Sequence, residues 1–124
     1  MTKVFTDVSV FLNAVGQRVP NHPIGKTDQS DLYKKLIDEE YQEFLEAYYT
    51  NDKAEELDAC FDMIWVIVGY MKSRGWDCEG AWDEGAKSNL SKIDPTTGLV
   101  RRREDGKILK PEGWTPPDFS KFVK

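Results

Sequence analysis

Acidic side chains at helical spacing are the residues of this sequence best suited to chemistry. Glu40 and Glu43 lie in a stretch whose apolar residues recur at helical spacing. On a helical wheel both carboxylates fall inside the apolar arc. Burying an ionised carboxylate without compensation is costly, so such positions normally have a cationic partner or bind a metal ion. Glu39 and Glu46 lie at the edge of the arc, where a solvated acidic face is an equally good interpretation.

A second pair of acids, Asp58 and Asp62, lies one helical turn apart farther along the chain. From Leu57 to Met71, nearly all residues other than Asp58 and Asp62 are apolar. Asp62 is therefore embedded among apolar side chains. Aspartate is a poor helix former, and two aspartates at positions i and i+4 repel each other unless a cation lies between them. Glu55 and Glu56 suit the start of a helix because of its dipole. Asp62 has no such explanation and is interpreted as a metal ligand.

Two antiparallel helices joined by a short turn would bring these acids together in an all-oxygen site. Oxygen ligands without nitrogen or sulfur select Mg²⁺ or Mn²⁺, and Mg²⁺ commonly takes substrate phosphate oxygens as further ligands. Carboxylate-bound iron is disfavoured because such bundles use Glu-x-x-His. The single histidine, His22, lies between prolines in a predicted loop. The chemistry implied is phosphoryl or nucleotidyl transfer to water.

Four helices are expected to position these groups. Capping residues and glycines predict the following bounds: Thr6 or Asp7 to about Gly16, Asp28 or Ser30 to about Thr50, about Asp52 to Arg74, and about Asp77 to Ser91. Asp105-Gly106 predicts a hairpin, and the prolines that follow it predict an extended segment lying over the helices. The expected architecture is one all-α domain, with helices in residues 1–92 and a basic hairpin and tail in residues 93–124.

The composition excludes several classes of protein. A length of 124 residues suits a single domain, and a net charge of −5 argues against a general nucleic-acid or membrane-surface binder. The longest apolar run, Met63 to Met71, is too short to span a membrane, and the first residues do not resemble an export signal. The two cysteines are too few for a disulfide framework. We therefore expect a cytoplasmic protein.

Charge is distributed unevenly along the chain. Between Asp28 and Asp62 there are twelve acidic and three basic residues, whereas between Lys87 and Lys110 there are seven basic and three acidic residues. An acidic helix pair followed by a basic segment suits a magnesium–nucleotide complex, which presents a cation and an anion. The predicted third helix is apolar on every side, so we expect a homodimer or homotetramer that completes a bundle of antiparallel helices.

The motifs together resemble a known family. Glu39-Glu40-Tyr41-Gln42-Glu43, followed by an acidic third helix, is similar to the Glu-Glu-x-x-Glu and second acidic motifs of the all-α NTP pyrophosphatases. These include MazG-like enzymes, dimeric dUTPases and phosphoribosyl-ATP pyrophosphohydrolases, and the chain resembles small proteins of the last type in particular. Nearly the whole chain contributes to the resemblance through these blocks: Leu36 to Ala47, Asp58 to Asp62 with Gly69 and Gly75, Ser88 to Lys92, Arg102 to Lys110, and Thr115 to Asp118.

The resemblance implies roles for the acidic residues. Glu40, Glu43 and Asp62 would ligate Mg²⁺, and Glu39 would orient the attacking water or a metal-bound water. The second motif of the family is usually Glu-x-x-Asp, but Ala59 stands where that glutamate would be. Asp58 is the substitute that we expect as a further ligand, with Glu55 one turn away as a possible additional metal or water contact.

The resemblance also implies contacts to substrate phosphates. Asn89 and Lys92 match a segment expected to make them, and Lys107 and Lys110 would help from the tail. Without the resemblance, Asn89 and Lys92 would be polar residues at the end of a helix, where lysine suits the dipole. The arginine run at 101–103 is as well explained by a solvated hairpin as by an anion-binding role.

The function implied is a Mg²⁺-dependent nucleoside triphosphate pyrophosphohydrolase, which releases a nucleoside monophosphate and pyrophosphate. Mn²⁺ is a possible substitute for Mg²⁺. Two alternatives stay open. In the first alternative, the substrate is phosphoribosyl-ATP in histidine biosynthesis. In the second, the domain is a non-catalytic helical module that binds nucleotides or another protein. Ala59 keeps the last alternative open, because it removes a family carboxylate.

Overall fold

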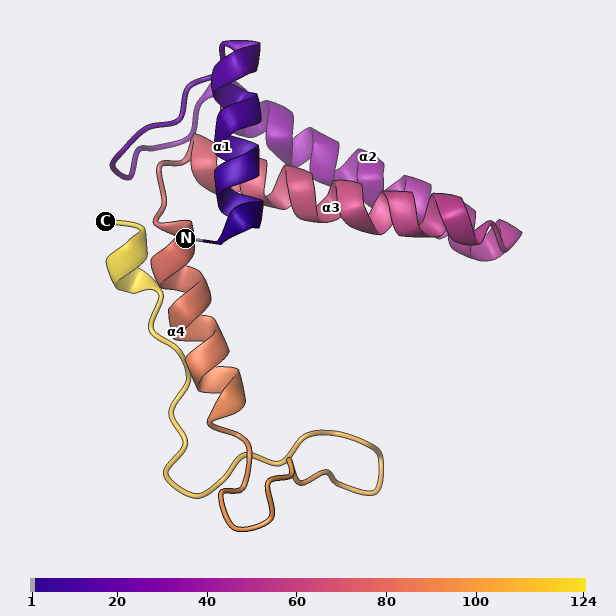
Figure 1. Ribbon diagram of the computed structural model, residues 1–124, viewed down its shortest axis with the longest axis vertical. Coiled ribbons are helices and arrows are strands. Elements are labelled where there is room, and N and C mark those ends of the chain that lie inside the picture. Colours follow the sequence, from indigo (N-terminus) through magenta and orange to yellow (C-terminus); the bar gives the residue numbers. More distant parts are fainter. Residues whose placement is uncertain (1) are drawn as a thin grey trace.

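The computed structural model describes residues 2–124, which contain four α-helices and one short 3-10 helix. The elements are α1 (Lys3–Val15), α2 (Asp28–Thr50), α3 (Lys53–Ser73), α4 (Cys78–Leu90) and η1 (Ser120–Phe122). Helices α2 and α3 form a long antiparallel hairpin, and α1 crosses one end of it (Figure 1). Helix α4 points away from the hairpin, and the tail returns along α4 (Figure 1). The prediction of an all-α fold is confirmed.

Local capping explains the α2–α3 hairpin. Thr27 and Ser30 form a reciprocal capping box at the start of α2. Asn51, which ends α2, adopts a left-handed φ of 59°, and Asp52 caps α3 by accepting a hydrogen bond from the Glu55 backbone N–H. A link of only two residues forces the helices to run antiparallel, as the sequence predicts.

Helix α1 begins earlier than predicted. It starts at Lys3, whereas Thr6 or Asp7 was expected as the cap. The Glu79 carboxylate accepts hydrogen bonds from the backbone N–H of Thr2 at 2.6 Å and from the Thr2 hydroxyl at 2.7 Å. This contact satisfies the start of the helix from a residue 77 positions away, which local sequence patterns cannot indicate.

The core lies where α1 crosses the α2–α3 hairpin. Val8 and Leu12 of α1 are fully buried there against residues of the other two helices. The Tyr33 ring of α2 lies directly on Gly69 of α3, at a position that a larger side chain would occupy. The Tyr33 hydroxyl donates a hydrogen bond to the Gln17 side chain at 2.6 Å, so the ring is fixed at both ends.

The apolar arc predicted for α2 is wider than the surface that neighbouring helices cover. Tyr41 and Tyr48, which belong to that arc, are 47% and 55% exposed. The third helix was expected to be fully covered only in an oligomer, and in the single chain Leu57 and Phe61 of α3 are 72% and 56% exposed. Helices α1 and α2 cover only part of α3, and the remainder faces outward in the single chain.

The tail packs along α4 through a few specific contacts. The Trp114 indole N–H donates to the Ser88 carbonyl at 3.0 Å, and the Phe122 ring lies so close to Gly80 that a side chain there would collide with it. Before the tail, the predicted hairpin is present as a turn with the single bridge Arg102↔Ile108 and no regular β-strand on either side of it. The extended segment therefore covers α4, whereas the sequence suggested that it lies over the helices in general.

Among residues 2–124 no helix is long and apolar enough to cross a membrane.

Replacing Gly69 with alanine tests the contact between α2 and α3. The added methyl group would collide with the Tyr33 ring, and overpacking of this kind costs about 1–3 kcal/mol of unfolding free energy. Urea denaturation of Gly69→Ala measures the loss. Gly25→Ala is the control, because a methyl group at Gly25 meets nothing within 4 Å. Equal stability of Gly69→Ala and the wild type would contradict the close approach of the two helices.

Candidate metal centre and basic arm

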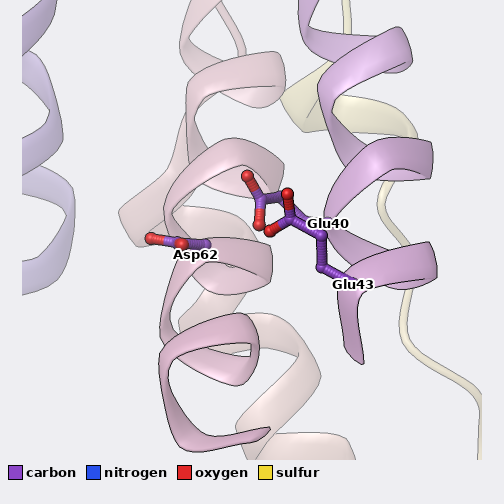
Figure 2. A group of neighbouring side chains, drawn as sticks. All are labelled: Glu40, Glu43 and Asp62. Atoms are coloured by element: carbon purple, nitrogen blue, oxygen red, sulfur yellow. The ribbon is translucent and has the colours of Figure 1, made fainter. Parts of the chain in front are cut away.

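Three carboxylates from the α2–α3 hairpin meet in one place. Oxygen atoms of Glu40, Glu43 and Asp62 all lie within 4.8 Å of one another. Glu40 and Glu43 come from adjacent turns of α2, and Asp62 comes from α3 opposite them (Figure 2). The sequence predicted this meeting from helical spacing and a short turn. Glu43 is exposed and Glu40 and Asp62 are half-buried, so the wheel placed Glu43 deeper than it lies.

Asp58 lies beside this group, one turn before Asp62 in α3. Its charge helps to raise the pKa of both Asp62 and Glu40, although it is outside the three residues whose oxygens converge. We call Glu40, Glu43, Asp58 and Asp62 the acidic cluster. The two remaining acidic candidates, Glu39 and Glu55, are exposed and lie outside the three-residue group.

The protonation of the acidic cluster reflects burial and like charge. Desolvation by burial, the hydrogen bond with Glu43 and the nearby charges of Glu43, Asp62 and Asp58 together raise the pKa of Glu40 to about 7. Burial, followed by the charges of Asp58 and Glu43, also raises the pKa of Asp62. Within residues 2–124 no lysine or arginine forms an ion pair with these carboxylates. The cluster therefore favours the binding of a proton or another cation.

The donor set fits a divalent metal ion. One oxygen of Glu40, Oε2, is shielded from solvent and has no hydrogen-bond partner. A buried polar atom without a partner costs free energy, which a bound cation would recover. Carboxylate oxygens without nitrogen or sulfur are the ligands of Mg²⁺ and Mn²⁺. Glu40, Glu43 and Asp62 could hold such an ion, with Asp58 adjacent.

The predicted phosphate-binding residues lie elsewhere, at the far end of α4. Lys92 donates a hydrogen bond to the Asn89 side chain at 3.0 Å. The ammonium groups of Lys92 and Lys110 lie 5.2 and 4.6 Å from the centre of the Trp114 ring. The structure thus gathers Asn89, Lys92 and Lys110. In one chain it does not bring them to the acidic cluster, because α4 and the hairpin point in different directions (Figure 1).

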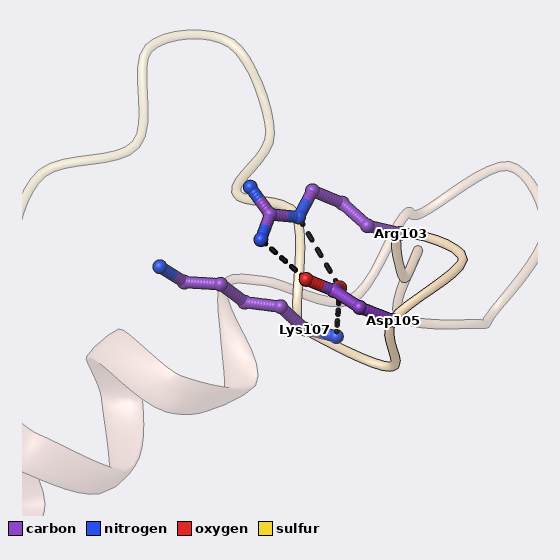
Figure 3. A network of polar contacts seen from close by, with 3 residues as sticks. All are labelled: Arg103, Asp105 and Lys107. Carbon is purple, nitrogen blue, oxygen red and sulfur yellow. Dashed lines mark hydrogen bonds and ion pairs between the residues drawn. The ribbon is translucent and has the colours of Figure 1, made fainter.

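Lys107 lies in the turn that follows α4. Its backbone N–H donates to the Asp105 carboxylate at 3.0 Å, and the same carboxylate pairs with Arg103 at 2.6 Å (Figure 3). The Lys107 side chain extends away from this pair and is exposed (Figure 3). The pairing explains Arg103 as part of a stable turn and leaves the Lys107 ammonium group free to meet an anion. We call residues 87–114 the basic arm.

Trp114 is a residue whose position sequence reasoning did not determine. Its indole N–H joins the tail to α4, and the ammonium groups of Lys92 and Lys110 lie against its ring. A cavity of about 370 Å³ lies beside it, with Lys87, Ser88 and Ser91 of the helix end among its lining residues. No sequence spacing indicated this contact, because it joins residues 26 positions apart through an irregular segment.

Comparison with known proteins places the acidic cluster within a recognised sequence pattern. The model of a family described as phosphoribosyl-ATP pyrophosphohydrolase matches residues 8–89, about two thirds of the chain. The match includes most of α1, the whole α2–α3 hairpin and α4 as far as Asn89, but not Lys92 or the rest of the basic arm. A search of curated proteins found no match.

The raised pKa of Glu40 predicts how stability depends on pH without metal. A carboxyl group with a higher pKa in the folded state stabilises the fold below its unfolded pKa, and this contribution is lost as pH rises toward about 7. In EDTA, the unfolding free energy should therefore fall more between about pH 5 and about pH 8 in the wild type than in Asp58→Asn, which lacks one repelling charge. Urea denaturation at both pH values measures the difference.

Glu46→Gln is the matched control for this pH dependence. It removes an exposed charge from α2 outside the acidic cluster and should change the dependence less than Asp58→Asn does. The same pH dependence in the wild type and in Asp58→Asn would contradict the charge coupling within the cluster.

Proposed function

The chain belongs to the phosphoribosyl-ATP pyrophosphohydrolase family, and from this membership and the acidic cluster we propose that it is a Mg²⁺-dependent nucleoside triphosphate pyrophosphohydrolase. Enzymes of this family are nucleotide pyrophosphohydrolases, which hydrolyse acid anhydrides of phosphorus. In the proposed reaction, a water oxygen bonds to the α-phosphorus and the bond from that phosphorus to the α–β bridging oxygen breaks. The products are a nucleoside monophosphate and pyrophosphate, and a proton is released from the water.

The partnerless oxygen of Glu40 is the observation that best supports a metal in this reaction. Glu40, Glu43 and Asp62 would hold Mg²⁺, or Mn²⁺ as a substitute, with Asp58 as a neighbouring ligand or water contact. The ion would supply neutralisation of the charge on the phosphate oxygens. Like-charged carboxylates with no lysine or arginine partner among residues 2–124 form a site that binds a cation more readily than a structural ion pair would.

Glu39 is the residue that we propose to orient the water. It follows Asp38 on the exposed side of α2 and adjoins Glu40, and it is not one of the three residues whose oxygens converge. A carboxylate left outside the ligand set can accept a proton from the attacking water. Glu55, one turn before Asp58 and Ala59 in α3, is a second candidate to contact a metal-bound water.

Asn89, Lys92, Lys107 and Lys110 are the proposed contacts to the phosphates. Their amide and ammonium groups are donors that suit phosphate oxygens. Such contacts stabilise the negative charge that moves onto the leaving pyrophosphate. A cytoplasmic location fits this substrate class and the two free cysteines, Cys60 and Cys78.

Phosphoribosyl-ATP is the second candidate substrate, because the matching family carries its name. It contains the same α–β phosphoanhydride bond, so the acidic cluster would act on it in the same way. The two proposals differ in the group attached to the nucleoside and therefore in the contacts outside the metal centre. A direct comparison of substrates distinguishes them.

The proposed activity is tested by following products with phosphorus NMR. With Mg²⁺, the wild type should convert one or more members of a panel of NTPs, dNTPs and phosphoribosyl-ATP to a monophosphate and intact pyrophosphate. Glu43→Gln and Asp62→Asn should each lower kcat/KM by about 100-fold or more, because each removes a ligand of the charge-neutralising ion. Glu46→Gln, which changes an exposed carboxylate of α2 outside the acidic cluster, should stay close to the wild type.

Two results would contradict this assignment. Formation of a nucleoside diphosphate and orthophosphate would place the cleavage at the β–γ bond. Full Mg²⁺-dependent turnover by Glu43→Gln would show that the metal is bound elsewhere.

Metal binding is tested separately from turnover by thermal unfolding. A ligand that binds only the native state raises the melting temperature by mass action. Mg²⁺ should therefore raise the Tm of the wild type and of Glu46→Gln, and should raise that of Glu43→Gln much less. A shift in the wild type without turnover of any nucleotide would favour the non-catalytic binding module. The absence of a shift over millimolar Mg²⁺ would contradict the metal centre.

A further inference from the structure

The cavity beside Trp114 lies between the end of α4 and the tail, and no residue of the acidic cluster lines it. Its helix wall consists of Glu84, Lys87, Ser88 and Ser91, which recur at helical spacing. Residues 111–117 of the tail, which returns along α4, form the other wall (Figure 1). A volume of about 370 Å³ is small for a ligand site and suits one compact molecule. We call this cavity the α4–tail pocket.

One hydroxyl in the α4–tail pocket has no hydrogen-bond partner. Ser88 is 8% exposed, and its Oγ atom is shielded from solvent and unpartnered among residues 2–124. The Ser88 carbonyl, by contrast, accepts hydrogen bonds from the Trp114 indole N–H at 3.0 Å and from the Ser91 hydroxyl at 2.6 Å. Buried hydroxyls are nearly always satisfied in proteins, because an unsatisfied one lowers the stability of the fold. The Ser88 hydroxyl is therefore available to a group that enters the pocket.

The tail is attached to α4 at two points, so the α4–tail pocket is formed without a ligand. The Trp114 indole holds the tail at one point, and at the other the backbone N–H of Asp118 donates to the Glu84 carboxylate at 2.9 Å. The segment between these contacts contains Pro116 and Pro117, whose rings fix the backbone φ angle. A wall that is already ordered loses little conformational entropy when a ligand binds.

The charged groups that line the α4–tail pocket are mixed in sign. Lys87 contributes one ammonium group, and Glu84 and Glu112 contribute two carboxylates. The Glu84 carboxylate lies 3.8 Å from the Lys121 ammonium group, whereas Lys87 and Glu112 have no ion-pair partner among residues 2–124. Two carboxylates against one ammonium group disfavour a polyanion such as a triphosphate. An uncharged ligand with both hydrogen-bond donors and acceptors suits this lining.

The apolar part of the lining favours a flat ring. Pro111, Pro116, Pro117 and Trp114 are among the residues around the pocket, and their rings offer flat apolar surfaces. A nucleobase combines a planar ring with donors and acceptors along its edge. An exocyclic amino group, which adenine and cytosine carry and uracil lacks, donates hydrogen bonds to carboxylates. The two carboxylates of the pocket therefore favour a base that carries an amino group.

We propose that the α4–tail pocket binds a nucleoside whose base carries an amino group, at a site separate from the acidic cluster. The Ser88 hydroxyl and the Glu84 and Glu112 carboxylates would hydrogen-bond to the edge of the base, and the proline rings would cover its faces. The site is complete in one chain and needs no metal ion, so it goes beyond the proposed function. A ligand there contacts both α4 and the tail and would hold the two segments together.

Nuclear magnetic resonance of the indole groups tests the site in the full chain. Cytidine and uridine are a matched pair, because cytidine has an amino group where uridine has a keto oxygen. In EDTA, cytidine should move the Trp114 indole N–H signal, which is identified by its loss in Trp114→Phe, and should leave the signal of Trp65 in α3 unchanged. Uridine should bind several-fold more weakly. No movement of the Trp114 signal over millimolar cytidine, or equal affinity for uridine, would overturn the proposal.

Replacement of two buried serines separates ligand binding from a structural role. Ser88→Ala removes an unpartnered hydroxyl, so it should not lower the urea stability of the free protein. It should weaken cytidine binding about 3- to 10-fold, because one hydrogen bond to the ligand is lost. Ser73→Ala is the matched control, since the Ser73 hydroxyl donates to the Gly69 carbonyl and accepts from the Gln29 side chain, both at 2.8 Å. It should lower stability and leave cytidine affinity unchanged.

Glu112→Gln tests the preference for an amino group. An amide donates as well as accepts, so this variant should discriminate less between cytidine and uridine than the wild type does. Asp83→Asn, which changes an exposed carboxylate of α4 outside the pocket, should keep the wild-type preference. An unchanged preference in Glu112→Gln would overturn the role of this carboxylate.

Two further results bear on Ser88 and on the independence of the site. Full cytidine affinity in Ser88→Ala, or a loss of stability like that of Ser73→Ala, would overturn the assignment of the Ser88 hydroxyl to a ligand. Nucleosides contain no phosphoanhydride bond and EDTA removes divalent metal ions, so none of these results depends on nucleotide hydrolysis. Cytidine binding without turnover of any nucleotide would support the pocket while the proposed function fails. Turnover without cytidine binding would overturn the pocket alone.

Discussion

Mutual repulsion among the carboxylates held between α2 and α3 is the constraint on which the rest of the molecule depends. The four carboxylates of the acidic cluster lower the stability of the fold unless a bound cation or a proton neutralises part of their charge. The hairpin tolerates this cost because its own packing is strong: the Tyr33 ring lies on Gly69, and α1 covers the end where Val8 and Leu12 are buried. Stability is concentrated at one end of the hairpin, and the acids occupy its middle.

The helices and the acidic cluster could be predicted from the sequence because both depend on local spacing. The start of α2 was predicted at Asp28 or Ser30, and Thr27 caps it next to that position. Glu40, Glu43 and Asp62 converge because two regular helices meet through the short link at Asn51 and Asp52. Periodicity and caps carry this information within a few residues of each position.

The remaining features could not be predicted because they depend on contacts between distant residues. The start of α1 is set by Glu79, and the direction of α4 is set where Gly75 meets His22. The wheel overestimated the burial of Glu43, because it counts apolar neighbours on the same helix and not the surface that another helix covers. A single sequence also gives no measure of how far the basic residues lie from the acids, since that distance depends on the turn at Gly75 between α3 and α4.

The bonds from Thr2 to Glu79 have a consequence for the order in which the chain folds. Glu43 of α2 and Asp62 of α3 lie 19 positions apart on either side of the link at Asn51 and Asp52, so closing this part of the hairpin costs less chain entropy than a long-range contact does. The tie from Thr2 to Glu79 spans 77 positions and gains free energy only after α1 has docked on α3 and the joint at Gly75 has closed. We therefore expect the carboxylates to come together before the basic arm takes its orientation.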